Sequence, residues 1–277
     1  MNIVQLHERV RFWVDIVAST RFDSQSIDNG INVAIDSKVR ESYDQNRPMN
    51  RSDAFQRVQR VRDELGPLVK DMRNEAGLSI VVSLVPVGTP GKVIVTITDD
   101  LTDFGWLLSM RMHDDTYTEW YPVFPISHNR KDVVKRNPYR RVRVTPESKA
   151  YYYEENGGWV IDHLFPDISD VQIYYLATPA IVNYGVEYNS TKSFSEDDEI
   201  IAVEETVYDG NTYKIGEKMT VTLNPSITSG LVVFGYIECD VRQTTHEEIS
   251  RRAAMNCLTA ARQYDKVNEL RKEITAS

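Results

Sequence analysis

The chain has 277 residues, enough for one large domain or two modest ones that can each bury an apolar core. Its formal net charge of −9 argues against a general affinity for nucleic acid, because an acidic surface repels phosphates. Cys239 and Cys257 are too few for a structural zinc site or a disulfide framework, so we expect folding in a reducing compartment. The first apolar stretch is interrupted by charges, unlike a signal peptide, and no apolar run approaches the length of a membrane span, so we expect no membrane partner.

Residues 1–77 are predicted to be helical. Apolar side chains recur at helical spacing in three successive segments before Gly66-Pro67, a dipeptide that interrupts the third segment because proline lacks an amide donor. A last helical piece is expected around 68–72, with Gly77 as its stop. Polar side chains that can cap a helix stand at the starts of the three segments: Asn2, Asp23 or Ser24, and Ser52.

Residues 78–240 are predicted to form a β-rich region. Runs of β-branched and aromatic residues, separated by turn-forming residues, mark the first four strands at 78–86, 92–98, 106–114 and 119–127. Further along, Asn156-Gly157 supplies the positive φ that a tight hairpin turn demands. The segment VQIYYLATPA (171–180) is typical of a strand buried on both faces, which Pro179 ends by removing a ladder donor.

The last segment, 241–277, returns to helical spacing, and Thr245 with Glu248 matches a capping box at its start. Helices at both ends therefore bracket the β-rich middle, and we expect them to pack together. The predicted fold is α+β: N- and C-terminal helices form a bundle into which a sandwich- or barrel-like region is inserted. We expect divisions at 1–77, 78–240 and 241–277, with an acidic insertion over about 187–230.

Charged residues gather in two opposite clusters. Seven basic side chains stand between 128 and 143 against a single acid, and eight acids stand between 187 and 209 against a single lysine. The basic cluster can meet DNA phosphates, the acids of a partner or only solvent. We favour a partner surface, because Tyr139 stands among fork-shaped arginine donors, and the two clusters could pair between neighbouring copies. The candidate contact residues are Arg130, Lys131, Lys135, Arg136, Arg140, Arg141, Arg143, Glu196, Asp197, Asp198 and Glu199.

No pattern in the sequence indicates catalysis or metal binding. HEEIS (246–250) matches the first half of a zinc-peptidase motif, but Ser250 stands where the second histidine ligand is required. The nucleophile elbow, the P-loop and the dinucleotide-binding motif are absent, and the acids at 196–199 lack the spacing of a calcium loop. A hydrolase that uses Glu154–Glu155 or Asp162 is a weaker alternative without support from spacing. We therefore expect no enzymatic activity, no catalytic residue, no cofactor and no bound metal.

Five blocks of the sequence, taken in order, resemble a known family. They are LHERVRFWVDIV, RFDSQSIDNGINVAIDSKVRESYD, NPYRRVRVTPESKAYYYEENGGWVIDH, IYYLATPA and THEEISRRAAMNCLTAA. This order of hydrophobic blocks and turns resembles the head–tail connector, or neck ring, proteins of tailed bacteriophages, especially those of crAss-like phages. The resemblance covers both ends of the chain and the core at 138–180. The acidic region at 187–230 has no counterpart in it.

The resemblance implies a structural virion protein that forms a homo-oligomeric ring of about twelve copies. Such an adaptor ring binds beneath the portal, joins it to downstream neck or tail proteins, and lines or surrounds the channel through which genomic DNA passes during ejection. It is assembled in the host cytoplasm and resides in the neck or tail region of the virion. The alternative is a tail or baseplate-type β-sandwich module that binds a protein or carbohydrate ligand.

Overall fold

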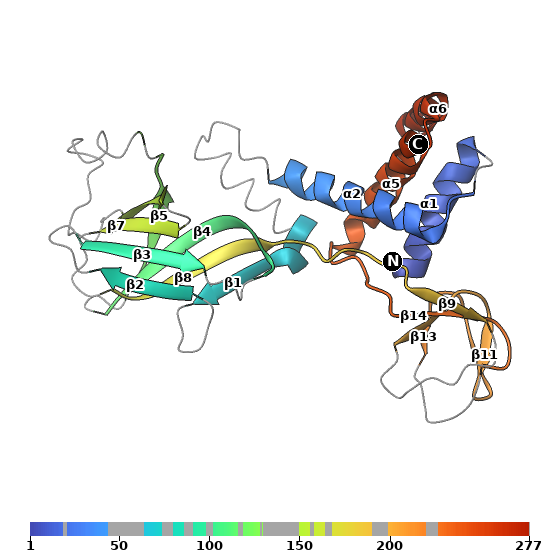
Figure 1. The fold of residues 1–277 in the computed structure, drawn as a ribbon, viewed down its shortest axis with the longest axis horizontal. Coiled ribbons are helices and arrows are strands. Elements are labelled where there is room, and N and C mark those ends of the chain that lie inside the picture. The colour runs from blue at the N-terminus through green and yellow to red at the C-terminus, as the bar shows by residue number, and fades with distance from the viewer. Residues whose placement is uncertain are drawn as a thin grey trace. The chain divides into compact units, whose positions relative to one another are not determined.

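The computed structural model has an α+β fold, with helices at both ends of the chain and strands between them (Figure 1). The described residues are 1–18, 21–43, 64–73, 80–85, 91–97, 102–115, 119–127, 129, 150–155, 158–163, 168–189, 199–219 and 227–276. The chain divides into a terminal unit, Met1–Pro67 with Pro179–Ser277, and an inserted unit, Leu68–Thr178. These boundaries differ from the divisions at 77 and 240 that composition suggests. Among the described helices, none is both long and apolar enough to cross a membrane.

The terminal unit contains four described helices, and two of them begin at the caps expected from the sequence. The helices are α1 (Ile3–Val17), α2 (Ser24–Ser42), α5 (His246–Ala260) and α6 (Tyr264–Ala276). The side-chain oxygen of Asn2 accepts a hydrogen bond from the Gln5 amide at 2.9 Å, and the Gln5 side chain accepts one in return from the Asn2 amide. Asp23 accepts a hydrogen bond from the Ser26 amide at 3.0 Å. Both predicted caps are confirmed.

The start of α5 and the break after it differ from the expectation of one capped helix. Thr245 ends a short 3-10 turn, η3 (Gln243–Thr245), and its hydroxyl donates to the Arg242 carbonyl at 2.7 Å instead of capping the helix. The predicted capping box is wrong, because Glu248 forms ion pairs with two basic side chains instead. Beyond α5, Arg262 adopts a left-handed φ of 58°, which separates α5 from α6.

Small residues allow α2 and α5 to pack closely. A Cβ atom at Gly30 would lie 2.8 Å from the Cys257 Sγ and 3.0 Å from the Ala253 carbonyl oxygen, so the absence of a side chain there permits the approach. The Asn256 side chain donates to the Gly30 carbonyl at 3.1 Å. Burial raises the pKa of the Cys257 thiol to about 11, so this group packs as a neutral side chain.

A small sheet completes the terminal unit. Its strands run antiparallel in the order β13 (Lys218–Met219), β10 (Ile200–Ala202), β14 (Leu231–Phe234) and β9 (Val186–Asn189). A separate hairpin joins β11 (Thr206–Tyr208) to β12 (Asn211–Tyr213). Asp209 and Gly210 form its turn, and both have the positive φ that a two-residue hairpin requires. Asn2, the cap of α1, donates through its side chain to the Gly216 carbonyl, which attaches this sheet to the helices.

The inserted unit is a curled eight-stranded sheet in the order β1-β8-β4-β5-β6-β7-β3-β2. Its strands are β1 (Val69–Arg73), β2 (Ile80–Val85), β3 (Gly91–Ile97), β4 (Phe104–Asp114), β5 (Glu119–Pro125), β6 (Ala150–Glu155), β7 (Gly158–His163) and β8 (Ile168–Ala177). Neighbouring strands are antiparallel except for the parallel pair β5 and β6. The predicted strands at 78–127 are confirmed. The predicted hairpin is confirmed by β6 and β7, where Glu155 lies opposite Gly158.

β8 confirms the prediction of a strand buried on both faces. It lies between β1 and β4, and Val171, Ile173 and Leu176 have almost no exposed surface. Gln172, in the same run, is also buried, and its amide donates to Asp71 on β1 at 3.0 Å. The strand ends before Pro179, as predicted.

β1 occupies the place of the predicted helical piece at 68–72. A 3-10 turn, η1 (Gly66–Leu68), contains Pro67, and the chain then extends so that Val69 lies opposite Leu176 of β8. Pairing with a distant strand overrides the local helical spacing, and the prediction of a helix here is wrong. Of the expected third helix, only 64–65 belongs to the described residues, and both positions are helical.

Candidate functional site

The structure describes one of the candidate contact residues. Glu199 is exposed directly before β10. The rest of the acidic set and the whole basic cluster lie outside the described residues: Glu196, Asp197, Asp198, Arg130, Lys131, Lys135, Arg136, Arg140, Arg141 and Arg143. The expected pairing between these two clusters therefore remains a prediction.

The residues of the HEEIS motif make contacts that hold the terminal unit together. His246 is buried, and its Nε2 donates to the Val241 carbonyl at 2.8 Å. Burial lowers the pKa of this imidazole and thereby favours its neutral form. Glu247 and Glu248 each form ion pairs with basic side chains. Within the described ranges, no three His, Cys, Asp or Glu side chains gather in a way that could hold a metal ion.

Side chains of α2 fix the segment 179–185, by which the chain enters the small sheet. The Asn32 side chain donates to the Val182 carbonyl at 3.0 Å and accepts from the Val182 amide at 2.7 Å. One turn earlier, both oxygens of Asp28 accept from the Tyr184 amide at 3.1 Å. The His7 Nε2 lies 2.8 Å from Asp28, and its ring packs on Tyr184 with 4.4 Å between centroids. We call this set of contacts the α2 clip.

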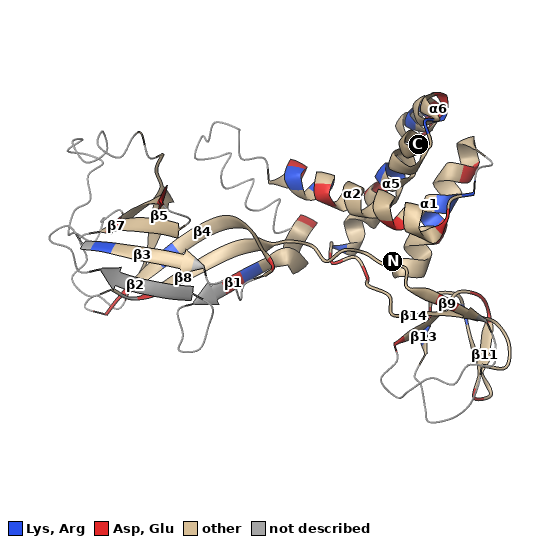
Figure 2. Cartoon of the chain, in the orientation of Figure 1, with Lys and Arg blue, Asp and Glu red and all other residues tan. Residues whose placement is uncertain are grey.

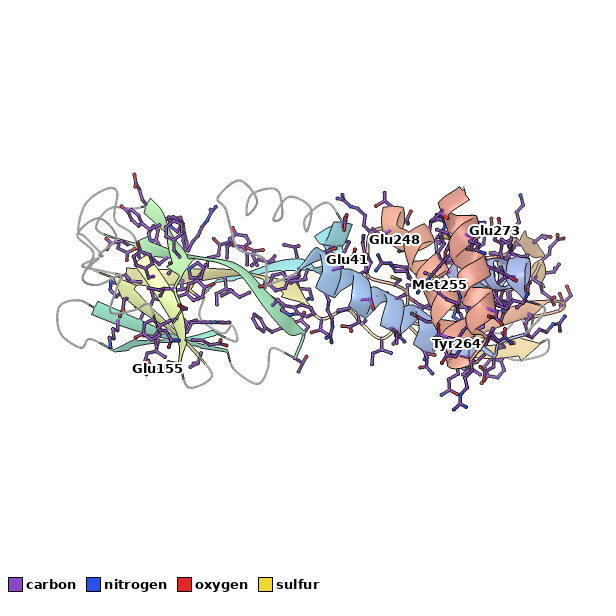
Figure 3. All side chains as sticks on the ribbon, turned by 90° about the horizontal axis from the view of Figure 1, so that it is seen from above. Glu41, Glu155, Glu248, Met255, Tyr264 and Glu273 are labelled. Atoms are coloured by element: carbon purple, nitrogen blue, oxygen red, sulfur yellow. The ribbon has the colours of Figure 1, made fainter. Side chains whose placement is uncertain are left out.

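A charged network joins α2 to α5 and to residue 64. The Lys38 Nζ lies 2.8 Å from a Glu248 carboxylate oxygen and 3.1 Å from one of Glu64. Burial lowers the pKa of Lys38, but the two carboxylates outweigh that effect, so the amine remains charged. Arg252 bridges Glu41 of α2 and Glu248 of α5, two residues that lie side by side in Figure 3.

An aromatic and arginine cluster covers the contact between α1 and α5. Arg9 donates twice to Glu247, at 2.8 and 2.9 Å, and these hydrogen bonds lower the pKa of that carboxyl. The guanidinium of Arg9 lies 4.7 Å from the centre of the Phe12 ring, and that of Arg251 lies 4.7 Å from Trp13. Phe12 nevertheless has 48% of its surface exposed, which is unusual for an aromatic side chain on a helix.

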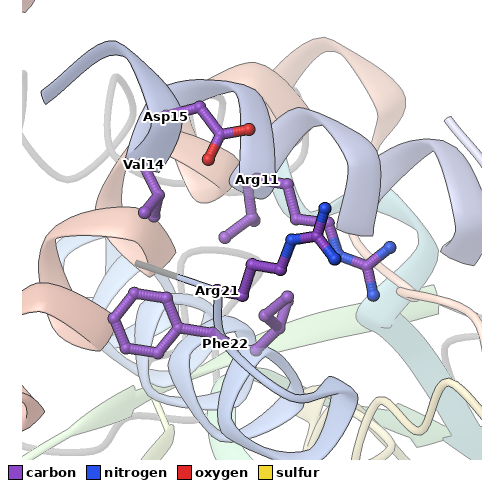
Figure 4. A pocket seen from close by; sticks show the side chains of 7 residues that line it. Arg11, Val14, Asp15, Arg21 and Phe22 are labelled. Carbon is purple, nitrogen blue, oxygen red and sulfur yellow. The ribbon is translucent and has the colours of Figure 1, made fainter. Parts of the chain in front are cut away.

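A pocket opens between the second half of α1 and the start of α2. It has a volume of about 430 Å³, and Figure 4 shows it at close range. Its lining residues are Val10, Arg11, Val14, Asp15, Arg21, Phe22 and Ile27. The guanidinium groups of Arg11 and Arg21 point to one side of the opening, away from Val14 and Phe22. We call this feature the α1–α2 pocket. Its apolar wall and paired guanidiniums suit a ligand that combines an apolar group with negative charge.

The acidic charge of the described terminal unit is concentrated on the small sheet (Figure 2). Between 186 and 240 the described residues include eight acids and two lysines, whereas the rest of this unit carries acidic and basic side chains in equal number. The acids are Glu187, Glu199, Glu204, Glu205, Asp209, Glu217, Glu238 and Asp240. The described residues of 186–240 therefore carry a net negative charge, while the rest of the described terminal unit is balanced in charge.

One part of the small sheet combines this negative charge with exposed aliphatic side chains. Ile215 and Ile237 are 46% and 44% exposed. The Lys218 Nζ lies 3.8 Å from Glu238 and 5.7 Å from the centre of the Tyr236 ring, so Lys218 lies beside residues 236 and 238. Burial lowers the pKa of Lys218, but neighbours that include Glu238 and Glu199 raise it overall. We call this surface the acidic edge: Glu199, Ile215, Glu217, Ile237 and Glu238.

No protein-family model matches the chain, and no curated protein sequence shows significant similarity to it.

Neither the α1–α2 pocket nor the acidic edge, apart from Glu199, is predicted from the sequence. One signal for the pocket is present in the sequence: Arg11 in the first predicted helix and Arg21 in the break before the second both stand close to apolar residues. The acidic edge has no comparable signal, because it depends on the pairing of β10 with both β13 and β14.

Proposed function

We propose that this chain is a structural virion protein of a tailed bacteriophage, a head–tail connector that forms a neck ring between the portal and the tail. The proposal starts from the five sequence blocks that resemble such connectors. The observation that carries it is the presence of two unlike surfaces in the terminal unit, one with paired guanidiniums and one acidic. A head-to-tail ring needs two different, complementary surfaces on every copy.

The division into two units suits such a role. Helices from both ends of the chain meet in the terminal unit, where they can form the body of a ring. The inserted unit then remains available for the portal, for tail proteins or for the wall around the DNA channel. A net charge of −9 supports passage of DNA, since an acidic lumen does not retain phosphates. We propose no enzymatic activity for this chain.

The test is the oligomeric state of the full chain, alone and with its portal protein. Sedimentation velocity and negative-stain electron microscopy should show closed rings, with about twelve copies expected for a connector. The protein should also be present in purified phage particles. A chain that stays monomeric in both preparations and is missing from the particles would refute the proposal.

The basic cluster at 130–143 provides a second test of ring assembly. If it meets the acids at 196–199 of a neighbouring copy, then reversal of charge at Arg140 and Arg141 should weaken the rings. Reversal at Glu196 and Asp197 should have the same effect. Unchanged assembly in both variants would reject this pairing.

A second candidate function, a tail or baseplate-type binding module, is favoured by the outer face of β5. Trp120 and Phe124 are exposed on alternate positions of this strand, and the Phe124 ring lies 6.4 Å from that of Tyr151 on β6. Exposed aromatic faces are typical of protein-binding surfaces. A glycan and protein binding screen with Trp120→Ala as the matched variant distinguishes the two functions. A monomeric chain that loses a ligand on this substitution is a binding module.

A further inference from the structure

We infer that the α1–α2 pocket receives the acidic edge of a second copy of this chain, an inference that rests on the proposed ring function. The pocket is lined by the second half of α1 and the start of α2, whereas Gly216, between Ile215 and Glu217 of the acidic edge, accepts a hydrogen bond from Asn2 at the start of α1. A contact between them is therefore head-to-tail, and repetition of one such contact closes a ring when the rotation allows it.

The pocket offers both parts of the required complementarity. Val10, Val14 and Phe22 supply an apolar wall, and a volume of about 430 Å³ is comparable to sites that enclose small molecules, so it can hold aliphatic side chains. Arg11 and Arg21 supply positive charge against the single acid of the lining, Asp15. Arginine forks are well suited to carboxylates at interfaces.

Neither arginine is neutralised by an ion pair within the described part of the chain. Arg11 lies close enough to Tyr184 to lower the pKa of the tyrosine hydroxyl, although burial raises that pKa by more. Glu8 and Glu187 also raise the pKa of this hydroxyl. Arg21 is exposed and therefore accessible to a partner.

The apolar surface extends beyond the pocket along α1. Residues of an α-helix are turned by 100° from one to the next, so Phe12 and Ile16 share a face that adjoins the pocket rim at Asp15. Their exposed fractions are 48% and 45%. An exposed aromatic and aliphatic pair of this kind is typical of the core of a protein interface.

The acidic edge matches this surface in charge and in hydrophobicity. Glu199, Glu217 and Glu238 outnumber Lys218, the one described lysine among them, which leaves a net negative charge. Ile215 and Ile237 supply exposed aliphatic groups of a size that the pocket can hold. Glu217 directly precedes β13, which is an edge strand of the small sheet.

Charge reversal on both sides tests the contact in the full-length protein. We expect Arg11→Glu with Arg21→Glu to weaken assembly by roughly tenfold or more in dissociation constant. Glu217→Lys with Glu238→Lys should weaken it similarly. A mixture of the two variants should assemble, because each reversed pocket can then meet a reversed edge while each wild-type pocket meets a wild-type edge. The quadruple variant should also regain rings. Sedimentation velocity measures the assembly, and circular dichroism shows that each variant is folded.

The matched control is Arg271→Glu with Lys272→Glu, two exposed positions on α6. This variant should assemble like the wild type. If both reversed variants form rings as well as the wild type does, the inference is overturned and the proposed function still stands. Wild-type chains that form no ring with the portal overturn the proposed function itself.

DNA is the other polyanion that two arginines could hold, and the same variants separate it from a second copy. Fluorescence anisotropy with a duplex should show no difference between the wild type and the doubly reversed pocket variant. If the pocket variant loses DNA binding while its rings persist, the pocket binds phosphates and the inference is overturned.

Discussion

Replacement of Asn32 by alanine should open the α2 clip. The change removes both hydrogen bonds to Val182 and leaves the amide and carbonyl of a residue that is only 1% exposed without their partner. Two such bonds contribute about 1–3 kcal/mol to the local opening free energy. The Val182 amide should therefore exchange roughly 5- to 150-fold faster with deuterium, since each 1.4 kcal/mol is tenfold.

Native-state hydrogen exchange, read by mass spectrometry of peptides that span 181–185, measures this effect. Asn29→Ala is the matched control, because Asn29 is an exposed asparagine on the same helix. The control should leave exchange in the peptide unchanged. The inserted unit should be unaffected in both variants. Equal exchange in the two variants would show that the clip does not hold the segment.

Three other substitutions test the terminal unit. Lys38→Met removes the ion pairs with Glu64 and Glu248 and should lower the free energy of unfolding by about 1–3 kcal/mol, because both carboxylates are partly exposed and Glu248 keeps Arg252. Lys38→Arg should lose less, and equal losses in a denaturant titration would contradict this. Arg9→Gln should lower the melting temperature more at neutral pH than in acid. Arg9 lowers the pKa of Glu247 below its ordinary 4.5, so this part of the stabilisation is present above that pH and is lost as the pH falls through the folded-state pKa, whereas the contact with Phe12 is lost at every pH. A melting difference of the same size at pH 7 and at pH 2 to 3 would refute the linkage. Gly30→Ala crowds the Cys257 Sγ, and Cys257→Ala relieves that contact. The loss of stability in the double variant should therefore be smaller than the sum of the two single losses by at least about 0.5 kcal/mol. Strictly additive losses would show that the two side chains do not clash.

Local signals predicted those elements whose causes are local. Asn2 and Asp23 cap helices because their side chains reach amides three residues away, and that relation is visible in the sequence. The strand at 171–180 could be predicted because its apolar run is continuous and a proline follows it. Thr245 does not cap α5 as its sequence position predicts, since the 3-10 turn before α5 gives it a helical backbone that prevents capping.

Non-local contacts account for what the sequence did not reveal. β1 is a strand because it pairs with β8, which lies about a hundred positions later in the sequence. The residues of β1 by themselves do not require a strand. The assignment of 179–240 to the terminal unit depends on bonds such as those of Asn32 with Val182, 150 positions apart. The two lining arginines are ten positions apart and meet only because α1 and α2 turn back on each other.

The insertion of one unit inside the other has a consequence for synthesis on the ribosome. Residues 68–178 are continuous, so a nascent chain can complete this sheet as soon as it emerges. α5, against which α2 packs, is translated only after this sheet. The apolar faces of the earlier helices therefore stay uncovered until α5 has been translated. The packing of the terminal unit is therefore completed last, after the polypeptide has been translated through α5.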